Sequence, residues 1–213
     1  MGSIKLPHAS GNSVSIAAPE ANPAADRTLY LPSNADGTVL TNTTPGCILQ
    51  VKQNSDTTTT GTLDLSDHQN YTSIPNLNVS ITPASASNKI LISFQAFGEG
   101  DVVDHKYQLR LERAISGGST TNIQGAASGS RILAMTMVNV GYNADDSNST
   151  PSASGISNYL DSPSTTSAVT YTVQIRSHNT STSEWNYNRT NGDSNGTDFE
   201  RGISWITVME VAA

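Results

Sequence analysis

The sequence predicts an all-β protein, and three observations support this fold class. About a third of the 213 residues are Ser, Thr or Asn, whose side chains compete for backbone hydrogen bonds and favour turns and polar loops over helices. No long run places its apolar residues at the helical period of about 3.6. Several short stretches instead alternate apolar and polar residues, and polar loops separate them, as in strands of a sandwich or barrel.

Residues 1–45 form a distinct segment. Its apolar residues lie in short extended pieces that Pro7, Gly11 and Pro19 interrupt. The segment has too few large apolar side chains to fold alone, so we expect neighbouring chains or a larger assembly to hold it. The residues expected to anchor it are Ile4, Leu6, Val14, Ile16, Leu29 and Leu31.

The pattern of apolar residues in 46–213 predicts eight or nine antiparallel strands. The clearest lies at 106–113, where Tyr107, Leu109 and Leu111 alternate with polar residues. Strands at this spacing favour a β-sandwich, and eight of them with the last one central fit a jelly roll. The expected strands span residues 48–53, 77–81, 90–97, 106–113, 132–140, 156–160, 169–176, 185–187 and 203–211.

The closing strand, 203–211, is apolar on both faces. One face carries Trp205 and Met209, and the other carries Ile206 and Val208. We expect a central strand whose second face is covered by copies of the chain around a three-fold axis. The alternative is that this strand and 132–140 are middle strands of a monomer beneath long loops. The expected trimer interface comprises Ile206, Val208, Leu133, Met135 and Met137.

Composition and charge argue against several functional classes. The net charge is −7 and Lys and Arg are not clustered, so no nucleic-acid partner is expected. The N-terminus lacks the apolar stretch of a secretory signal, and no apolar run is long enough for membrane insertion. The single cysteine, Cys47, fits synthesis in a reducing cytosol and is expected to pack as a small hydrophobe.

The sequence shows no arrangement typical of a catalytic or metal site, so we expect no enzyme activity and no cofactor. The histidines, at positions 8, 68, 105 and 178, are far apart in sequence, which gives no support to a zinc site. Polysaccharide cleavage would need a carboxylate pair. The candidates are Glu99, Asp101 and Asp104, or Asp145 and Asp146, and nothing in the sequence brings a pair together.

Two stretches resemble ligand sites. Asn191–Asp198 places Asx residues at alternate positions, as in the first half of a calcium loop, but Gly202 stands where the bidentate Glu belongs, so an ordinary Asx-rich turn is favoured. Aromatic rings beside Asn and Arg suggest a surface that binds a glycan. The residues are Tyr142, Trp185, Tyr187 and Arg189, although Trp185 could equally close the end of the sandwich.

Both ends of the chain resemble one family. Residues 13–32, Ser-Val-Ser-Ile-Ala-Ala-Pro-Glu-Ala-Asn-Pro-Ala-Ala-Asp-Arg-Thr-Leu-Tyr-Leu-Pro, and 35–40, Ala-Asp-Gly-Thr-Val-Leu, resemble a segment of tail-fibre-like virion proteins of marine bacteriophages, cyanophages among them. The family's Gly-x-Ile-Leu-Gln-Val and Ser-Trp-Ile-x-x-x-Glu strands match 46–51 and 204–210. The C-terminal part also looks like the tumour-necrosis-factor-like jelly rolls that cap many phage fibres as trimers.

The resemblance implies a homotrimeric virion surface protein that is assembled in the host cytoplasm. Residues 1–45 would attach it to capsid or tail proteins, and the jelly roll at 46–213 would project outward. We expect a short fibre or receptor-binding module that contacts a bacterial surface glycan through loops such as 142–154 and 179–200. The alternative, which the small size favours, is a capsid decoration or cement protein, or head fibre, with no host-binding role.

Overall fold

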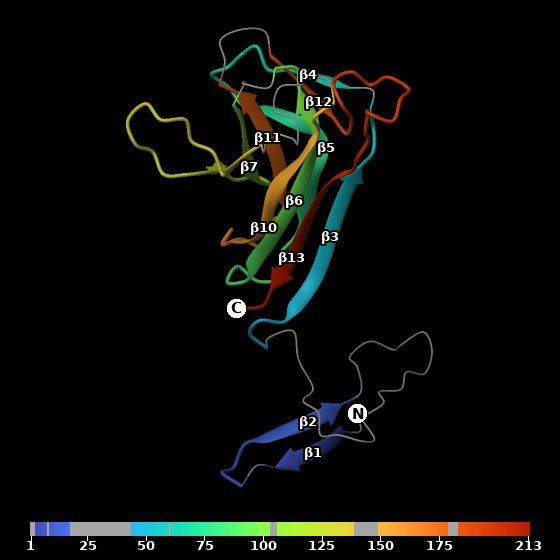
Figure 1. Ribbon diagram of the computed structural model, residues 1–213. Coiled ribbons are helices and arrows are strands. Elements are labelled where there is room, and N and C mark those ends of the chain that lie inside the picture. Colours follow the sequence, from blue (N-terminus) through green and yellow to red (C-terminus); the bar gives the residue numbers. More distant parts are fainter. Residues whose placement is uncertain are drawn as a thin grey trace. The chain divides into compact units, whose positions relative to one another are not determined.

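The computed structural model describes residues 3–7, 9–17, 44–59, 61–102, 106–138, 149–178 and 183–213 (Figure 1). The chain divides into two compact units, Met1–Val39 and Leu40–Ala213, which we describe separately. The described residues form strands and loops and no helix, which confirms the predicted all-β class.

The N-terminal unit contains one antiparallel hairpin. Strand β1 (Ser3–Pro7) pairs with β2 (Ser13–Ala17), with Leu6 opposite Val14 and Ile4 opposite Ile16. Within this unit Leu6 and Ile16 are exposed by 53% and 60%. A two-stranded hairpin is marginally stable by itself. The role of these residues as a virion anchor stays a prediction. The other two expected anchor residues, Leu29 and Leu31, lie outside the described residues.

The larger unit is a sandwich of two antiparallel sheets. In the first sheet β13 lies between β3 and β6, β10 flanks β6, and β12 and β4 continue from the far end of β6. The second sheet has the order β5-β11-β7, and β8 and β9 both pair with β7. The strands are β3 (Ile48–Asp56), β4 (Thr62–Asp64), β5 (Thr72–Ile81), β6 (Lys89–Gly100), β7 (Tyr107–Ile115), β8 (Thr120–Ile123), β9 (Thr136–Met137), β10 (Ser152–Asp161), β11 (Val169–Ser177), β12 (Glu184–Tyr187) and β13 (Ser204–Val211).

The alternating strands bury their apolar faces between the two sheets, as predicted for β6, β7 and β11. Successive side chains of a strand point to opposite faces, so every second residue reaches the core. Each fully buried aliphatic side chain stabilises the fold by roughly 1.5–3 kcal/mol. The buried residues of these three strands are Ile90, Ile92, Phe94, Ala96, Tyr107, Leu109, Leu111, Val169, Tyr171, Val173 and Ile175.

The closing strand is central, as expected, but its two faces were assigned the wrong way round. β13 pairs with β3 along one edge and with β6 along the other. Ile206 and Val208 have no exposed surface because they face the second sheet within the same chain. Their expected place in a trimer interface is therefore wrong. An Asp at position 206 would unfold the sandwich, because it would bury an unpaired charge in the core.

The expected long strand at 132–140 is also wrong. Within its described residues, 132–138, only β9 (Thr136–Met137) is a strand, and it pairs with β7 at Leu109 and Gln108. Leu133 and Met135 are half-buried, and Met137 is 46% exposed. This segment is therefore mostly irregular and lies beside β7 of the second sheet. Its apolar residues at successive positions do not indicate a central strand.

A buried carboxylate connects β13 to its neighbours. Glu210 has no exposed surface, and its oxygens accept hydrogen bonds from Asn88 Nδ2 (2.6 Å), the Ala84 amide (2.7 Å) and Gln50 Nε2 (2.6 Å). Burial alone would raise the pKa of Glu210, but these donors and the Ser85 amide outweigh it, so the pKa lies below its ordinary value. The ionised form therefore stabilises the fold.

We predict that Glu210→Gln destabilises the sandwich by about 1–3 kcal/mol at neutral pH. The NH₂ group of the new side chain would face N–H donors of Gln50, Ala84 or Asn88, which now donate to the carboxylate. The wild type should lose this contribution as pH falls below the ordinary glutamate value, since protonation removes the charge that the donors stabilise. Urea unfolding of both proteins between neutral and acid pH measures the difference. The exposed Asp198→Asn variant is the control and should unfold like the wild type. Equal stability of Glu210→Gln and wild type at neutral pH would contradict the prediction.

Candidate functional site

The expected ligand rings lie in β12, at the end of the sandwich. β12 pairs with the last residues of β6 and with β4, which directs Trp185 and Tyr187 inward. Their exposed fractions are 1% and 9%, and the Trp185 ring centroid lies 5.5 Å from that of Tyr107. A ligand-stacking role for these two residues is therefore wrong, and the alternative that Trp185 closes the sandwich end is confirmed. Tyr142 lies outside the described residues.

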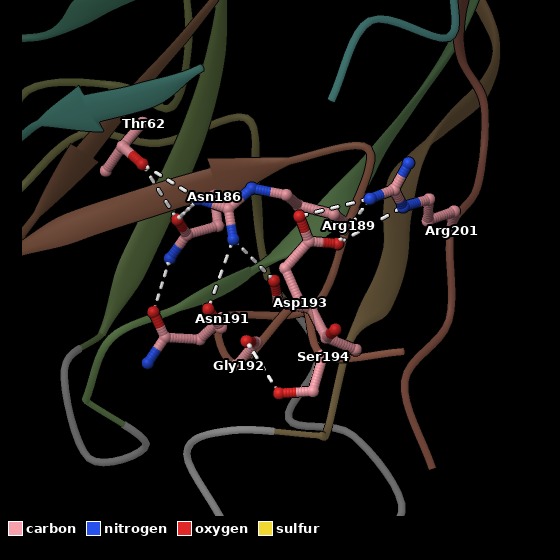
Figure 2. Close-up of polar contacts among 9 residues, drawn as sticks. Thr62, Asn186, Arg189, Asn191, Gly192, Asp193, Ser194 and Arg201 are labelled. Carbon is pink, nitrogen blue, oxygen red and sulfur yellow. Dashed lines mark hydrogen bonds and ion pairs between the residues drawn. The ribbon is translucent and has the colours of Figure 1, made fainter. Parts of the chain in front are cut away.

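Arg189 belongs to a network of polar side chains that fastens the loop after β12 to β4 (Figure 2). Its Nη2 donates to Asn186 Oδ1 (2.6 Å) and Thr62 Oγ1 (3.1 Å), and its Nη1 donates to the carbonyls of Thr190 (2.9 Å) and Asn191 (3.1 Å). Asn186 Nδ2 also donates to Asn191 Oδ1 (2.8 Å). The guanidinium therefore binds the protein's own oxygens, which gives Arg189 a structural role.

Two of the carboxylates considered for catalysis hold backbone in place. Glu99 is 3% exposed and accepts hydrogen bonds from the amides of Thr150 (2.9 Å) and Asn191 (2.7 Å). Asp101 accepts from the Tyr107 hydroxyl (3.0 Å) and the Glu184 amide (2.9 Å). These contacts fix the loops around the end of β6. The other candidates, at positions 104, 145 and 146, lie outside the described residues.

The Asx-rich loop has a cation of its own. Arg201 Nη2 donates to both oxygens of Asp193, at 2.9 and 3.1 Å (Figure 2). Ser194 Oγ also donates to the Gly192 carbonyl at 3.4 Å. These contacts are typical of an Asx-rich turn, and the carboxylate best placed for calcium already faces a guanidinium. Within the described part of the chain, no three His, Cys, Asp or Glu side chains are grouped closely enough to hold a metal.

Of the predicted ligand residues, Trp185 and Tyr187 thus face the core, and Arg189 binds oxygens of the chain itself. Thr62 and Asn186 complete the network with Arg189 and were not among the predicted site residues. Asn, Asp and Arg beside aromatic residues give the same sequence pattern whether they bind a ligand or each other. The network joins β4, β12 and the loop after β12 at this end of the sandwich.

Comparison with known proteins gives no family for the chain: no protein-family model and no curated protein matches it. Among the described residues, no helix is long and apolar enough to cross a membrane. The outer surfaces of the two sheets are therefore the features of this structure that bear on function.

We predict that Trp185→Ala destabilises the sandwich by about 3–5 kcal/mol, because it leaves a large cavity between β12 and the core. Thermal and urea unfolding measure the loss. The control is Tyr159→Ala on β10, where the ring is 37% exposed and the expected change is less than about 1 kcal/mol. A Trp185→Ala protein as stable as the control variant would show that the ring does not support the core.

Proposed function

We propose that the chain is a homotrimeric surface module of a bacteriophage virion, a short fibre or receptor-binding protein attached by its N-terminal segment. The observation that carries this proposal is a row of apolar side chains across the outer face of the first sheet. Cross-strand partners share one face of a sheet, and the pairings link Val51 to Met209, Met209 to Leu91, and Leu91 to Leu160. This apolar row crosses β3, β13, β6 and β10.

The apolar row lacks a cover within the described part of the chain. Val51 and Leu160 are 53% and 52% exposed, and nearby Ile203 is 43% exposed. A hollow of about 530 Å³ lies between Val51, Trp205 and Met209, and its lining contains no charged side chain. Contiguous exposed apolar surface of this kind marks an interaction site.

Copies of the chain itself suit this face. The protein carries a net charge of −7, so copies associate most readily through a surface that adds no like-charge pairs at the contact. The lining of the hollow meets that requirement. A three-fold arrangement would cover the outer face of β13, although through different residues from those expected from the sequence.

The strand order supports the jelly-roll assignment. The eight main strands are β3, β5, β6, β7, β8, β10, β11 and β13. Six of the seven steps between them change sheet, and only β7 and β8 follow one another in the same sheet. Two nested Greek keys produce this order. The first sheet then reads β3-β13-β6-β10 and the second β5-β11-β7-β8.

The two ends of the sandwich also suit attachment at one end and contact at the other. The amide of Gly46 donates to the Ala212 carbonyl and the Ala212 amide donates to the Cys47 carbonyl, each at 2.9 Å. The chain therefore enters the sandwich beside its own C-terminus. β4 and β12 lie at the opposite end (Figure 1).

A second candidate is a capsid decoration or cement protein. The burial of Trp185 and Tyr187 favours it, because it removes two rings from the surface that we expected to bind glycan. Gold-labelled antibodies on purified virions distinguish the two roles. A few copies at the tail or on projecting fibres support the fibre, whereas hundreds of copies at capsid three-fold positions would establish the decoration protein. Absence from the particle would overturn both.

We predict that Val51→Asp converts the trimer into monomers of 22.4 kDa, because assembly would bury an unpaired charge. Multi-angle light scattering measures the mass. Met137→Asp is the matched control: Met137 is similarly exposed, belongs to the interface expected from the sequence, and lies at the edge of the other sheet. Dissociation by Met137→Asp but not by Val51→Asp would move the interface to that edge. A wild-type mass of one chain would refute the trimer.

A further inference from the structure

Three arginines converge on one hollow on the outer side of the second sheet. Arg110 and Arg176 follow the fully buried residues Leu109 and Ile175, so their side chains lie on the opposite, outer face of β7 and β11. The strand register sets Arg110 opposite Gln174, two residues from Arg176. With Tyr71 and Arg131 they line an open hollow of about 360 Å³, which we call the arginine hollow.

Neutral groups fix the position of the two strand arginines. The guanidinium carbons of Arg110 and Arg176 lie 4.0 and 5.6 Å from the centre of the Tyr71 ring. Arg110 donates to the side-chain oxygens of Gln174 (2.8 Å) and Gln124 (3.2 Å). Arg176 donates to the carbonyls of Gln69 (3.4 Å) and His68. The Tyr71 ring is itself held by a 2.7 Å hydrogen bond from its hydroxyl to the Leu133 carbonyl.

No carboxylate of the described residues forms an ion pair with the arginines of the hollow. Among the described residues the ion pairs are Arg113 with Asp161 and Arg201 with Asp193, so the chain neutralises arginines elsewhere. No carboxylate lines the hollow. Two acids bind neighbours of the hollow and not its arginines: Glu112 accepts from Gln174 (3.2 Å) and Asp67 accepts from Asn70 (2.8 Å). Three of the chain's 11 basic residues thus gather around one opening.

Charge repulsion among these groups is one mark of a site prepared for an anion. Burial lowers the pKa of Arg110, and the positive charge of Arg176 acts in the same direction, against the opposing effects of Tyr71 and Glu112. A bound anion would offset both the burial of the Arg110 charge and its repulsion from Arg176. Guanidinium groups donate in a planar fork that matches carboxylate, sulfate and phosphate oxygens.

We propose that the arginine hollow binds the anionic groups of an acidic polysaccharide, either the carboxylate of a uronic acid or a sulfate ester. This inference rests on the proposed attachment role, since it identifies the class of surface glycan that the module would contact. The side chains of Asn70 and Gln124 also line the hollow and supply amide groups of the kind that bind sugar hydroxyls.

A polysaccharide suits the hollow better than a nucleic acid. Nucleic-acid sites neutralise several phosphates along a basic groove. Here the basic residues are confined to one hollow, Asp67 and Glu112 flank it, and the whole chain is acidic. A polymer with widely spaced charges and many hydroxyls can meet those three guanidinium groups without bringing excess negative charge to the rest of the surface.

The arginine hollow and the apolar row lie on opposite outer faces of the sandwich. Arg110 and Arg176 project from the second sheet, whereas Val51 and Met209 project from the first. Self-association through the apolar row would therefore leave the arginine hollow open to solvent. The two proposals are compatible in one particle.

The test measures binding of the intact protein to four polymers by isothermal titration calorimetry. Dextran sulfate and neutral dextran form a matched pair that isolates the sulfate, polygalacturonate tests the carboxylate, and duplex DNA tests the competing polymer class. The wild type should bind at least one acidic polysaccharide, more weakly at high salt, and should not bind dextran. Binding to whichever acidic polymer it prefers identifies the anion.

Arg176→Gln and Arg131→Gln should each weaken that binding by roughly tenfold or more, because each removes a charged donor. Arg131 is exposed, so its variant should fold normally even if Arg176→Gln does not, and unfolding temperatures check both. Arg201→Gln is the control, because this exposed arginine already faces Asp193, and it should bind like the wild type.

Four outcomes would overturn the inference: no binding of any acidic polysaccharide, equal binding of dextran, tighter binding of DNA, or unchanged binding by both folded arginine variants. None of them alters where antibodies find the protein on virions, so the hollow can fail while the proposed function stands. Loss of polymer binding in the arginine variants, with the protein absent from virions, would support the hollow as an acidic-polysaccharide site and overturn the attachment role.

Discussion

The sandwich depends on insertion of the last strand between β3 and β6. β3 pairs with β13 alone in the first sheet, so residues from the two ends of the larger unit must meet before this sheet is complete. Pairing of strands so distant in sequence is costly in loop entropy and slows folding. Once β13 is in place, Ile206 and Val208 complete the core, and Glu210 joins Gln50 to the 84–88 turn. Core packing, sheet closure and the apolar row all follow from that step.

The sequence predicted the strands whose two faces differ in polarity. β6, β7 and β11 alternate clearly, so their inward residues could be identified before the fold was known. β13 is apolar on both sides, and periodicity alone gives no way to tell which side faces the core. Ile206 and Val208 were therefore placed at an interface, whereas Trp205 and Met209 are the outward residues. The short strands β4 and β8 carry too few apolar residues to be predicted.

The candidate sites were harder to predict because they depend on side-chain direction and on register. Trp185 and Arg189 form a suggestive cluster in sequence, yet one faces the core and the other braces a loop. Tyr71, Arg110 and Arg176 are far apart in the chain, and each reads as an ordinary outward residue of a strand or turn. Only the pairing of β11 with both β7 and β5 brings them to one place.

The opposite placement of the apolar row and the arginine hollow has a consequence for attachment to a cell. In a trimer joined through the apolar row, three arginine hollows would face outward around one axis, toward a polymer that repeats the same charged unit. Linked sites raise the effective local concentration of ligand and can strengthen binding by roughly 10²–10⁴-fold without any new contact. Each hollow could then release and rebind rapidly while the particle as a whole stayed attached. Such avidity would let a virion move along a polysaccharide layer without leaving it.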